Sequence, residues 1–380
     1  MKIIAAPDSF KGSLSAAQAA RAIAEGALKA MPGAEIVELP LADGGEGTVD
    51  ALVAATGGRF HTKTVTGPLG EPVEAKYGEL GDGGTAVIEM AAAAGLGLVP
   101  ANARNPMLTS TYGVGELILA ARSHGFKRII IGVGGSGTND GGAGAMRALG
   151  VRFLDSAGRE LPPGGAALKD LASIDTSGLR IPADELEILV ACDVDNPLVG
   201  PKGASAVYGP QKGADAEMVS ALDSSLRRYA EAIQSALGVD ISLTPRGGAA
   251  GGLAAGLAAF LGADLRSGIE VVLDAVRFDD QIRAADLIIT GEGRIDAQTL
   301  YGKTIMGVLR CASGRAPVVA IGGCIADGAE ALYEEGLAGL FGITDQPMNQ
   351  EDAMRRAPEL ISKNARAIVA LFGSGKNAKG

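Results

Sequence analysis

The chain has 380 residues, more than twice the length of a typical domain of about 150 residues, so its length favours two domains. It contains 57 glycines, no tryptophan and only 4% aromatic residues, and its net charge is -10. A protein that binds nucleic acid needs a basic surface and aromatic rings on which bases stack, so this composition argues against that class.

Cysteine, histidine and signal features exclude several further classes. Three scattered cysteines fit a reduced cytosol rather than a disulfide framework, and two histidines argue against a His-rich metal site. The first ten residues do not form a signal peptide, and the uncharged segment 247–263 has the apolar spacing of one helix face rather than of a membrane span. We therefore expect a cytoplasmic protein without a membrane partner.

The N-terminal residues predict a strand–helix–strand–helix order. The apolar run Lys2–Ala6 is typical of a buried parallel strand, and Ser15 with Gln18 forms a capping-box pattern that opens a helix to about residue 30. A second strand is expected at Glu35–Pro40, followed by a glycine-rich acidic loop and another helix.

The last hundred residues repeat this order. Strands are predicted at Asp286–Thr290, Pro317–Ile321 and Gly339–Ile343, and a long helix at Asp352–Leu371. Strands that alternate with helices in this way favour an α/β fold with a doubly wound, flavodoxin- or Rossmann-like parallel sheet.

The middle of the chain has a different character, with longer loops, a predicted hairpin near Tyr77–Glu89 and several glycine-rich segments. We therefore predict a discontinuous domain formed by residues 1–66 and 286–380. A second α/β domain, residues 67–285, is inserted into it.

The strongest motif is the glycine-rich segment that follows the predicted strand Arg128–Val133 and precedes a helix. Glycines let backbone N–H groups approach an anion closely, and a helix N-terminus adds positive potential, so the segment predicts a phosphate site. The residues expected to bind the phosphates of a nucleotide are Gly134, Gly135, Ser136, Gly137, Thr138, Asn139, Gly141 and Gly142.

A dinucleotide site is the alternative interpretation of the same segment. Residues 132–137 match G-x-G-x-x-G, and Asp155 follows the strand-like Val151–Leu154, which would make the protein an NAD-dependent dehydrogenase. Asp140 argues against it, because a carboxylate beside a phosphate repels it unless a cation such as Mg²⁺ lies between them. Separately, Ala297, Gly302, Lys303 and Thr304 fit a P-loop pattern that lacks its first glycine, so Lys303 is a candidate for contact with a phosphate.

Four acidic segments follow predicted strands: 7–12, 42–47, 191–198 and 291–296. The carboxyl ends of strands in an open parallel sheet form the ligand crevice, so we expect the loops among them to supply a site for Mg²⁺ and a small polar substrate. In segment 191–198, Asp193 and Asp195 suit a base or a cation ligand.

Six blocks resemble the bacterial type I glycerate kinases: PDSFKGS (7–13), LADGGEGT (41–48), GVGGSGTNDGGAGA (132–145), CDVDNPL (192–198), GGAAGGL (247–253) and TGEGRID (290–296). They follow the order of that family and extend over nearly the whole chain. The resemblance implies two domains and phosphorylation of D-glycerate by ATP with Mg²⁺, with 2-phosphoglycerate favoured over 3-phosphoglycerate as product. It leaves the oligomeric state, including a homodimer, open.

This resemblance and the chemistry of phosphoryl transfer suggest roles for individual residues. The catalytic candidates are Asp193, Lys11, Arg294 and Asp8. The candidates for contact with the substrate are Ser9, Asp43, Glu46, Glu292 and Asp296. The candidates for Mg²⁺ are Asp140 and Asp193.

Overall fold

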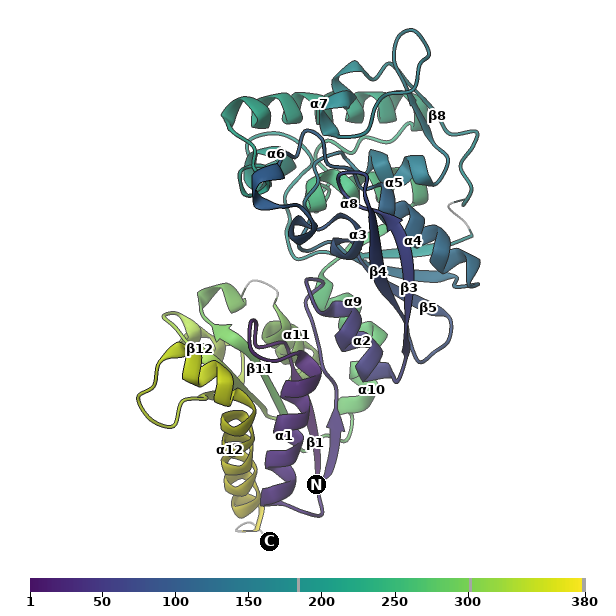
Figure 1. Ribbon diagram of the computed structural model, residues 1–380. Helices are drawn as coiled ribbons and strands as arrows, with labels where there is room; N and C mark the ends of the chain where they lie inside the picture. The colour runs from purple at the N-terminus through teal and green to yellow at the C-terminus, as the bar shows by residue number, and fades with distance from the viewer. Residues whose placement is uncertain (183–184, 301–302, 378–380) are drawn as a thin grey trace. The chain divides into compact units, whose positions relative to one another are not determined.

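The computed structural model describes residues 1–182, 185–300 and 303–377. The chain divides into two compact units (Figure 1). Unit 1 consists of Met1–Asp43, Asp50–Gly58 and Ile269–Gly380, and unit 2 consists of Gly44–Val49 and Arg59–Gly268.

Unit 1 contains a five-stranded sheet in the order β13-β12-β11-β1-β2, in which every neighbouring pair is parallel. Its strands are β1 (Lys2–Pro7), β2 (Glu35–Glu38), β11 (Leu287–Ile295), β12 (Val318–Ile325) and β13 (Leu337–Gly342). Its helices are α1 (Ala16–Ala30), most of α2 (Thr48–Thr56), α9 (Gly268–Ala275), α10 (Phe278–Ile282), α11 (Thr304–Ala312) and α12 (Gln350–Asn377), with short 3-10 helices at Ala297–Leu300 and Ala329–Tyr333.

The sheet of unit 1 is covered on both faces. Ile3, Leu287 and Val319 are buried on one face with residues of α1 and α12, which lie side by side in Figure 1. The alternate side chains Ile4 and Ile288 are also fully buried, as a doubly wound sheet requires. The prediction of an α/β fold with a parallel sheet is confirmed.

Helix α1 begins where the sequence predicts. The Ser15 hydroxyl accepts a hydrogen bond from the Gln18 N–H (3.2 Å), and the Gln18 side chain accepts one from the Ser15 N–H (2.9 Å). Gly26 lets α1 approach α12 closely, because a Cβ atom there would lie 2.1 Å from the Ser362 carbonyl oxygen. The core face of α1 is therefore rich in alanine and glycine.

Unit 2 contains a six-stranded sheet in the order β10-β9-β6-β5-β4-β3 and a separate two-stranded sheet, β7-β8. Its strands are β3 (Arg59–Thr66), β4 (Pro72–Glu79), β5 (Thr85–Glu89), β6 (Arg128–Gly132), β7 (Arg152–Leu154), β8 (Ser173–Asp175), β9 (Glu187–Ala191) and β10 (Asp264–Arg266). Its helices are α3 (Ala91–Ala94), α4 (Tyr112–Ser123), α5 (Ala143–Ala148), α6 (Ala204–Tyr208), α7 (Ala216–Leu237) and α8 (Leu253–Leu261), with 3-10 helices at Leu96–Leu98, Ala101–Ala103, Gly165–Asp170, Pro210–Lys212 and Ala249–Gly252.

The six-stranded sheet is mixed. The pairs β5–β6, β6–β9 and β9–β10 are parallel, whereas β3–β4 and β4–β5 are antiparallel. The antiparallel β4–β5 pair confirms the predicted hairpin. The parallel half of the sheet directs the carboxyl ends of its strands to one edge, where ligands bind in open sheets of this kind.

The boundaries of the units differ from those predicted at 66/67 and 285/286. Residues 59–66 form β3 and pair with β4, which places them in unit 2, and residues 269–285 belong to unit 1. The strand-like pattern of 59–66 does not show which sheet it joins, because periodicity carries no information on the pairing partner. That the two units fold as separate domains stays a prediction.

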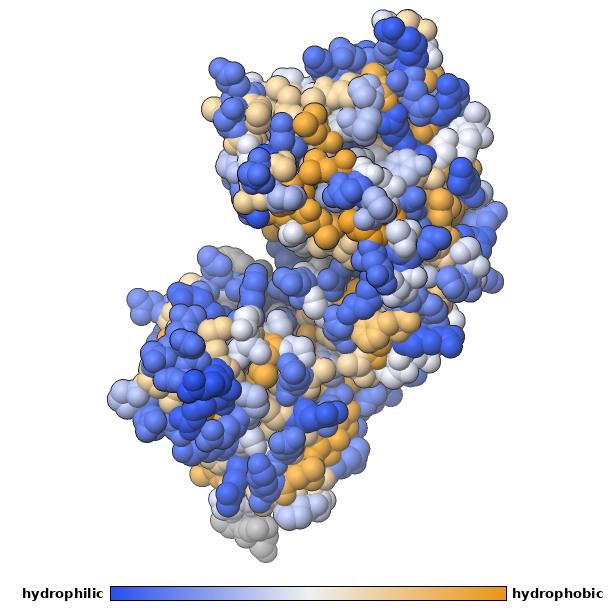
Figure 2. Space-filling view, in the orientation of Figure 1, coloured by the Kyte–Doolittle hydropathy of each residue, from blue (hydrophilic) through white to orange (hydrophobic). Residues whose placement is uncertain are grey.

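The viewed surface of both units is mostly hydrophilic, with smaller hydrophobic areas (Figure 2). Among the residues that the structure describes, no helix combines the length and the hydropathy needed to span a bilayer.

Candidate functional site

Unit 1 places a carboxylate, Asp8, directly after β1. The Asp8 N–H donates to the Gly291 carbonyl of β11 (2.8 Å), and the Asp8 side chain accepts hydrogen bonds from the Ser9 N–H (2.5 Å) and the Thr304 hydroxyl (2.5 Å). Burial, and then the nearby Asp43 carboxylate, raise the pKa of Asp8 to about 6, although the Thr304 and Ser9 bonds oppose the shift. Asp8 is thus held in one orientation with a pKa near the range of a general base.

A second carboxylate, Glu292, follows on the neighbouring strand. The residue is 9% exposed, and its carboxylate accepts a hydrogen bond from the Thr299 hydroxyl (2.8 Å) and lies 3.9 Å from the Lys303 ammonium nitrogen. Burial raises the pKa of Glu292 to about 7 despite the hydrogen bond from Thr299 and the charge of Lys303. Two carboxyl groups with raised pKa values therefore lie at the carboxyl-end edge of this sheet, a pattern typical of functional sites.

The segment 291–296 is not the loop that the sequence predicts. Strand β11 continues to Ile295, because β12 continues beside it to Ile325 and pairs with it up to the last residue of both strands. Glycines permit this close pairing: a Cβ atom at Gly291 would lie 2.2 Å from the Ile321 carbonyl oxygen, and one at Gly323 would lie 2.6 Å from the Gly293 carbonyl oxygen. Glu292 is consequently held by a strand rather than by a turn.

The other predicted residues of unit 1 are more exposed. Arg294 and Asp296 bind each other, with 2.9 Å between Nε and Oδ2, and the Arg294 side chain is 66% exposed. Lys11 is exposed and takes part in no ion pair among the residues described, and Asp43 is half-buried. Gly302 lies outside the described residues.

Thr304 is a residue of this site to which the sequence analysis assigned no role. It is fully buried at the first position of α11, and its hydroxyl reaches Asp8, which is 296 positions away in the chain. The near P-loop pattern that drew attention to Lys303 includes Thr304 and is the sequence signal that marks it.

Unit 2 presents the first half of the glycine-rich motif at its surface. Gly132 pairs with Ala191, so the chain leaves β6 beside the end of β9 and continues as the partly exposed Gly134, Gly135 and Ser136. Within the described part of the chain, the N–H groups of these three residues have no hydrogen-bond partner. They form the part of the motif that can donate to an anion.

The second half of the motif is buried. Thr138, Asn139 and Asp140 are at most 1% exposed. A Cβ atom at Gly141 would lie 2.6 Å from the Tyr229 ring, and one at Gly142 would lie 3.1 Å from the Leu253 Cα atom. These glycines permit close packing inside unit 2, so the geometry does not favour the predicted phosphate contact for residues 138–142.

Asp140 organises this buried segment. Its carboxylate accepts hydrogen bonds from the N–H of Thr111 (2.8 Å), the hydroxyl of Thr111 (2.9 Å), the N–H of Gly142 (3.1 Å) and the N–H of Gly144 (3.2 Å). Burial raises its pKa, and these bonds oppose the shift. The environment favours a structural role for Asp140 over the predicted contact with Mg²⁺.

Asp193 and Glu46 lie nearer the surface of unit 2. Asp193 follows β9, is exposed and accepts a hydrogen bond from the Gly268 N–H (2.9 Å). Glu46 is exposed in a segment anchored by Glu89, whose carboxylate accepts from the N–H groups of Gly47 (3.0 Å) and Val49 (2.9 Å). The loop 42–47 is thus divided, with Asp43 in unit 1 and Glu46 in unit 2.

The described residues include no group of three or more His, Cys, Asp or Glu side chains that could hold a metal ion. Mg²⁺ commonly keeps several waters and binds through one or two carboxylates together with the phosphates of a nucleotide. The exposed Asp193 carboxylate, at the same sheet edge as residues 134–136, fits such a site.

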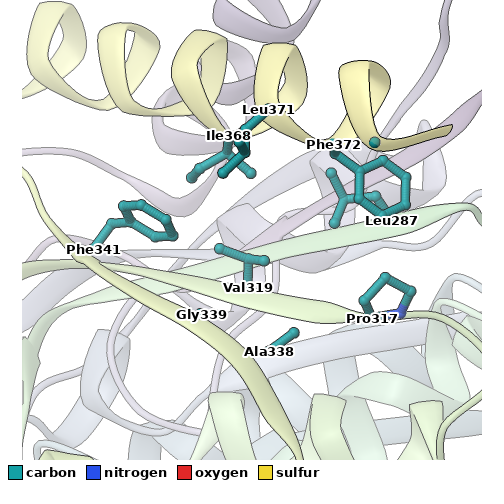
Figure 3. A pocket seen from close by; sticks show the side chains of 10 residues that line it. Leu287, Pro317, Val319, Ala338, Gly339, Phe341, Ile368, Leu371 and Phe372 are labelled. Carbon is teal, nitrogen blue, oxygen red and sulfur yellow. The ribbon is translucent and has the colours of Figure 1, made fainter. Parts of the chain in front are cut away.

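An apolar cavity of about 620 Å³ in unit 1 is separate from these groups. Figure 3 shows it under α12, with Leu287, Val319, Phe341, Ile368 and Phe372 around it. The described residues that line it include no charged side chain. Leu287 is the first residue of β11, and Pro317 directly precedes β12, so the cavity lies near the amino ends of these strands. The described lining therefore offers no partner to a charged substrate.

The dinucleotide alternative has no support in the geometry. A Rossmann unit requires the next strand to join the same parallel sheet, whereas β7 pairs antiparallel with β8 in a separate two-stranded sheet. Asp155 accepts hydrogen bonds from the N–H groups of Ala157 and Arg159 and binds the Arg159 guanidinium at 2.9 Å. It stabilises a local turn.

Comparisons with a family model, with related sequences and with solved structures all point to one protein family. The model of the glycerate kinase family matches residues 3–373. The chain is 55% identical over 371 residues to the glycerate kinase of Bacillus subtilis (strain 168), covering 97% of each chain, and 48% identical over 381 residues to the glycerate 2-kinase of Escherichia coli (strain K12), covering 100% of each. A crystal structure of a candidate glycerate kinase 2 from Salmonella typhimurium LT2 superimposes with a TM-score of 0.90 at 49% identity and 99% coverage of both chains.

Proposed function

The chain belongs to the glycerate kinase family and is an ATP-dependent kinase, and on this premise we propose that it transfers the γ-phosphoryl group of ATP to the 2-hydroxyl of D-glycerate. The motif blocks favour the type I branch of the family. The full-length similarity to the glycerate 2-kinase of Escherichia coli supports 2-phosphoglycerate as the product.

The structural observation that carries the proposal is Asp8. Transfer of a phosphoryl group to an alcohol needs a proton acceptor for the hydroxyl and charge stabilisation for the phosphoryl oxygens. Asp8 is oriented by Thr304 and the Ser9 N–H, and with a pKa of about 6 it is ionised at neutral pH. We assign it the role of accepting the proton of the substrate hydroxyl.

For the nucleotide, we propose that the N–H groups of Gly134, Gly135 and Ser136 donate to phosphate oxygens. When bound, Mg²⁺ would neutralise phosphate charge, with Asp193 as its ligand from the protein. Support comes from the exposure of these residues at the carboxyl ends of neighbouring parallel strands.

The remaining candidates of the site are cations and polar groups proposed to surround the substrate. Lys11, Arg294 and Lys303 are the cations of unit 1 proposed to bind the glycerate carboxylate or the phosphoryl group, and Arg suits a planar anion. The polar groups proposed to surround the substrate or to orient these cations are Ser9, Asp43, Glu46, Glu292 and Asp296.

The test is a coupled assay of ADP release with product identification. We expect ADP release that requires both D-glycerate and Mg²⁺, and a ³¹P NMR spectrum of 2-phosphoglycerate. ADP release that is independent of glycerate would contradict the substrate assignment. Formation of 3-phosphoglycerate would contradict only the position of attack.

A further inference from the structure

A lysine lies buried in unit 2 beneath the glycine-rich motif. Lys212, at the end of the 3-10 helix Pro210–Lys212, is 1% exposed, and its ammonium group donates a hydrogen bond to the Thr138 carbonyl oxygen (2.7 Å). Among the described residues no carboxylate lies within ion-pair distance of it. Lysine is almost never fully buried unless it is paired, so this placement needs an explanation.

Stability does not provide that explanation. Burial opposes the charged form of the amine, and replacement of buried charges by apolar side chains of similar volume is often neutral or stabilising. The same place holds two further unfavourable groups, because Thr138 Oγ1 and Asn139 Oδ1 are buried without a hydrogen-bond partner among the described residues. Each of these buried groups lowers the stability of the folded state. Their presence together indicates that the region was selected for function rather than for stability.

The contact of Lys212 lies next to the exposed part of the motif. Thr138 is two positions after Ser136, and Gly137 between them is fixed by two hydrogen bonds: its N–H donates to the Ala94 carbonyl (2.9 Å), and its carbonyl accepts from the Thr109 hydroxyl (2.9 Å). Lys212 holds the next carbonyl in the chain. The segment 134–136 therefore ends at a rigid anchor that includes the buried Lys212 amine, whose pKa is lowered by burial to about 7.

The carboxylate of Asp140 does not cancel that charge by direct pairing. It is occupied by donors from Thr111, Gly142 and Gly144, and its effect on Lys212 is the longer-range attraction of opposite charges. A charge in a water-excluded interior is screened less than one at the surface. In its charged form, which the Asp140 carboxylate favours, Lys212 can thus add positive potential at the loop without touching a ligand.

We propose that Lys212 is a positioning residue for nucleotide binding, which holds the Thr138 carbonyl and adds positive potential beneath residues 134–136. The inference depends on the proposed contact of these residues with the phosphates of ATP. It predicts that the charge of Lys212 matters for the nucleotide and not for D-glycerate.

The experiment compares the wild type with Lys212→Met, an unbranched apolar side chain of similar volume, and Lys212→Gln, which keeps an N–H donor but removes the charge. The exposed Lys169→Met in the same unit is the matched control. Binding of Mg-ADP is measured by calorimetry, KM for ATP and for D-glycerate by steady-state kinetics, and Tm by thermal unfolding.

We expect Lys212→Met to raise the Kd for Mg-ADP and the KM for ATP about tenfold to hundredfold. For the same variant, we expect the KM for D-glycerate to stay within about twofold of wild type and Tm to be equal or higher. For Lys212→Gln, we expect a nucleotide affinity between those of the wild type and Lys212→Met. The proposal would be overturned if Lys212→Met bound the nucleotide as tightly as the wild type. If that variant does not fold, the same result in Lys212→Gln would overturn it. So would an equal loss of affinity for both substrates together with a lower Tm. Failure of the wild type to bind Mg-ADP would instead contradict the proposed function.

Discussion

Asp8 in unit 1 and Asp140 in unit 2 both lie in segments that follow a parallel strand, β1 and β6, but their surroundings differ. Asp8 is half-buried at the sheet edge, accepts from Thr304 and Ser9, and takes part in no ion pair among the residues described. Asp140 is 1% exposed and is enclosed by donors from three residues of its own unit.

Under the proposed function, this difference separates a carboxylate that takes part in the reaction from one that stabilises the fold. Burial raises the pKa of both groups. Of the two, Asp8 is the more exposed and lies at the carboxyl-end edge of its sheet, where we propose that the substrate hydroxyl binds. A raised pKa therefore does not identify a catalytic group unless the group is also accessible.

The largest effect is expected from Asp140→Asn. The amide nitrogen would face the N–H donors of Thr111, Gly142 or Gly144, and buried donors would lose their acceptor. We expect a loss of about 3–5 kcal/mol in the free energy of unfolding, measured by urea denaturation of soluble protein. A stability within about 0.5 kcal/mol of wild type would show that Asp140 is not structural and would return it to the candidates for Mg²⁺.

Asp8→Asn should lower activity and leave stability nearly unchanged, the reverse of Asp140→Asn. The amide oxygen still accepts from Thr304, so folding is retained, but the proton acceptor is lost and kcat should fall about 10²- to 10⁴-fold. Steady-state kinetics at pH 8 measures the loss, and Glu25→Gln on the exposed face of α1 is the matched control in the same unit. Wild-type kcat in Asp8→Asn would exclude the proposed base.

Asp193→Asn should have a smaller effect. It removes a hard ligand while keeping the shape that accepts from Gly268, so we expect kcat at limiting Mg²⁺ to fall about tenfold or more. Titration with Mg²⁺ distinguishes the roles, because recovery at high Mg²⁺ indicates metal binding and persistent loss indicates proton transfer. No change under either condition would assign Asp193 to the turn after β9.

The smallest effect is expected from Glu292→Gln in unit 1, on the pH dependence of thermal stability. The pKa of Glu292 is raised from 4.5 to about 7, so the folded state binds more protons than the unfolded state between these values. Stability attributable to this group therefore falls as pH rises through this window. Glu292→Gln should raise Tm by roughly 2–6 °C at pH 8 and change it little at pH 5. A lower Tm at pH 8 would show that the contact with Lys303 outweighs the cost of burial.

The sequence alone was sufficient to predict the strands, turns and helix starts that depend on residues close together in the chain. The capping box at Ser15, the β4–β5 hairpin and the glycine-rich segment after β6 are set by neighbouring residues, and the structure has each of them. The six motif blocks also identified the family, because six matches in the family order between residues 7 and 296 are more specific than any single motif.

Only the tertiary structure decided which groups meet and which are accessible. The contact between Thr304 and Asp8, the extension of β11 beside β12 and the burial of Lys212 under Thr138 join residues far apart in the chain. No local pattern encodes such contacts, since side-chain periodicity reports the face of an element and not its partner. For the same reason the sequence could not separate Gly134–Ser136, which reach the surface, from Thr138–Asp140, which the packing of unit 2 encloses.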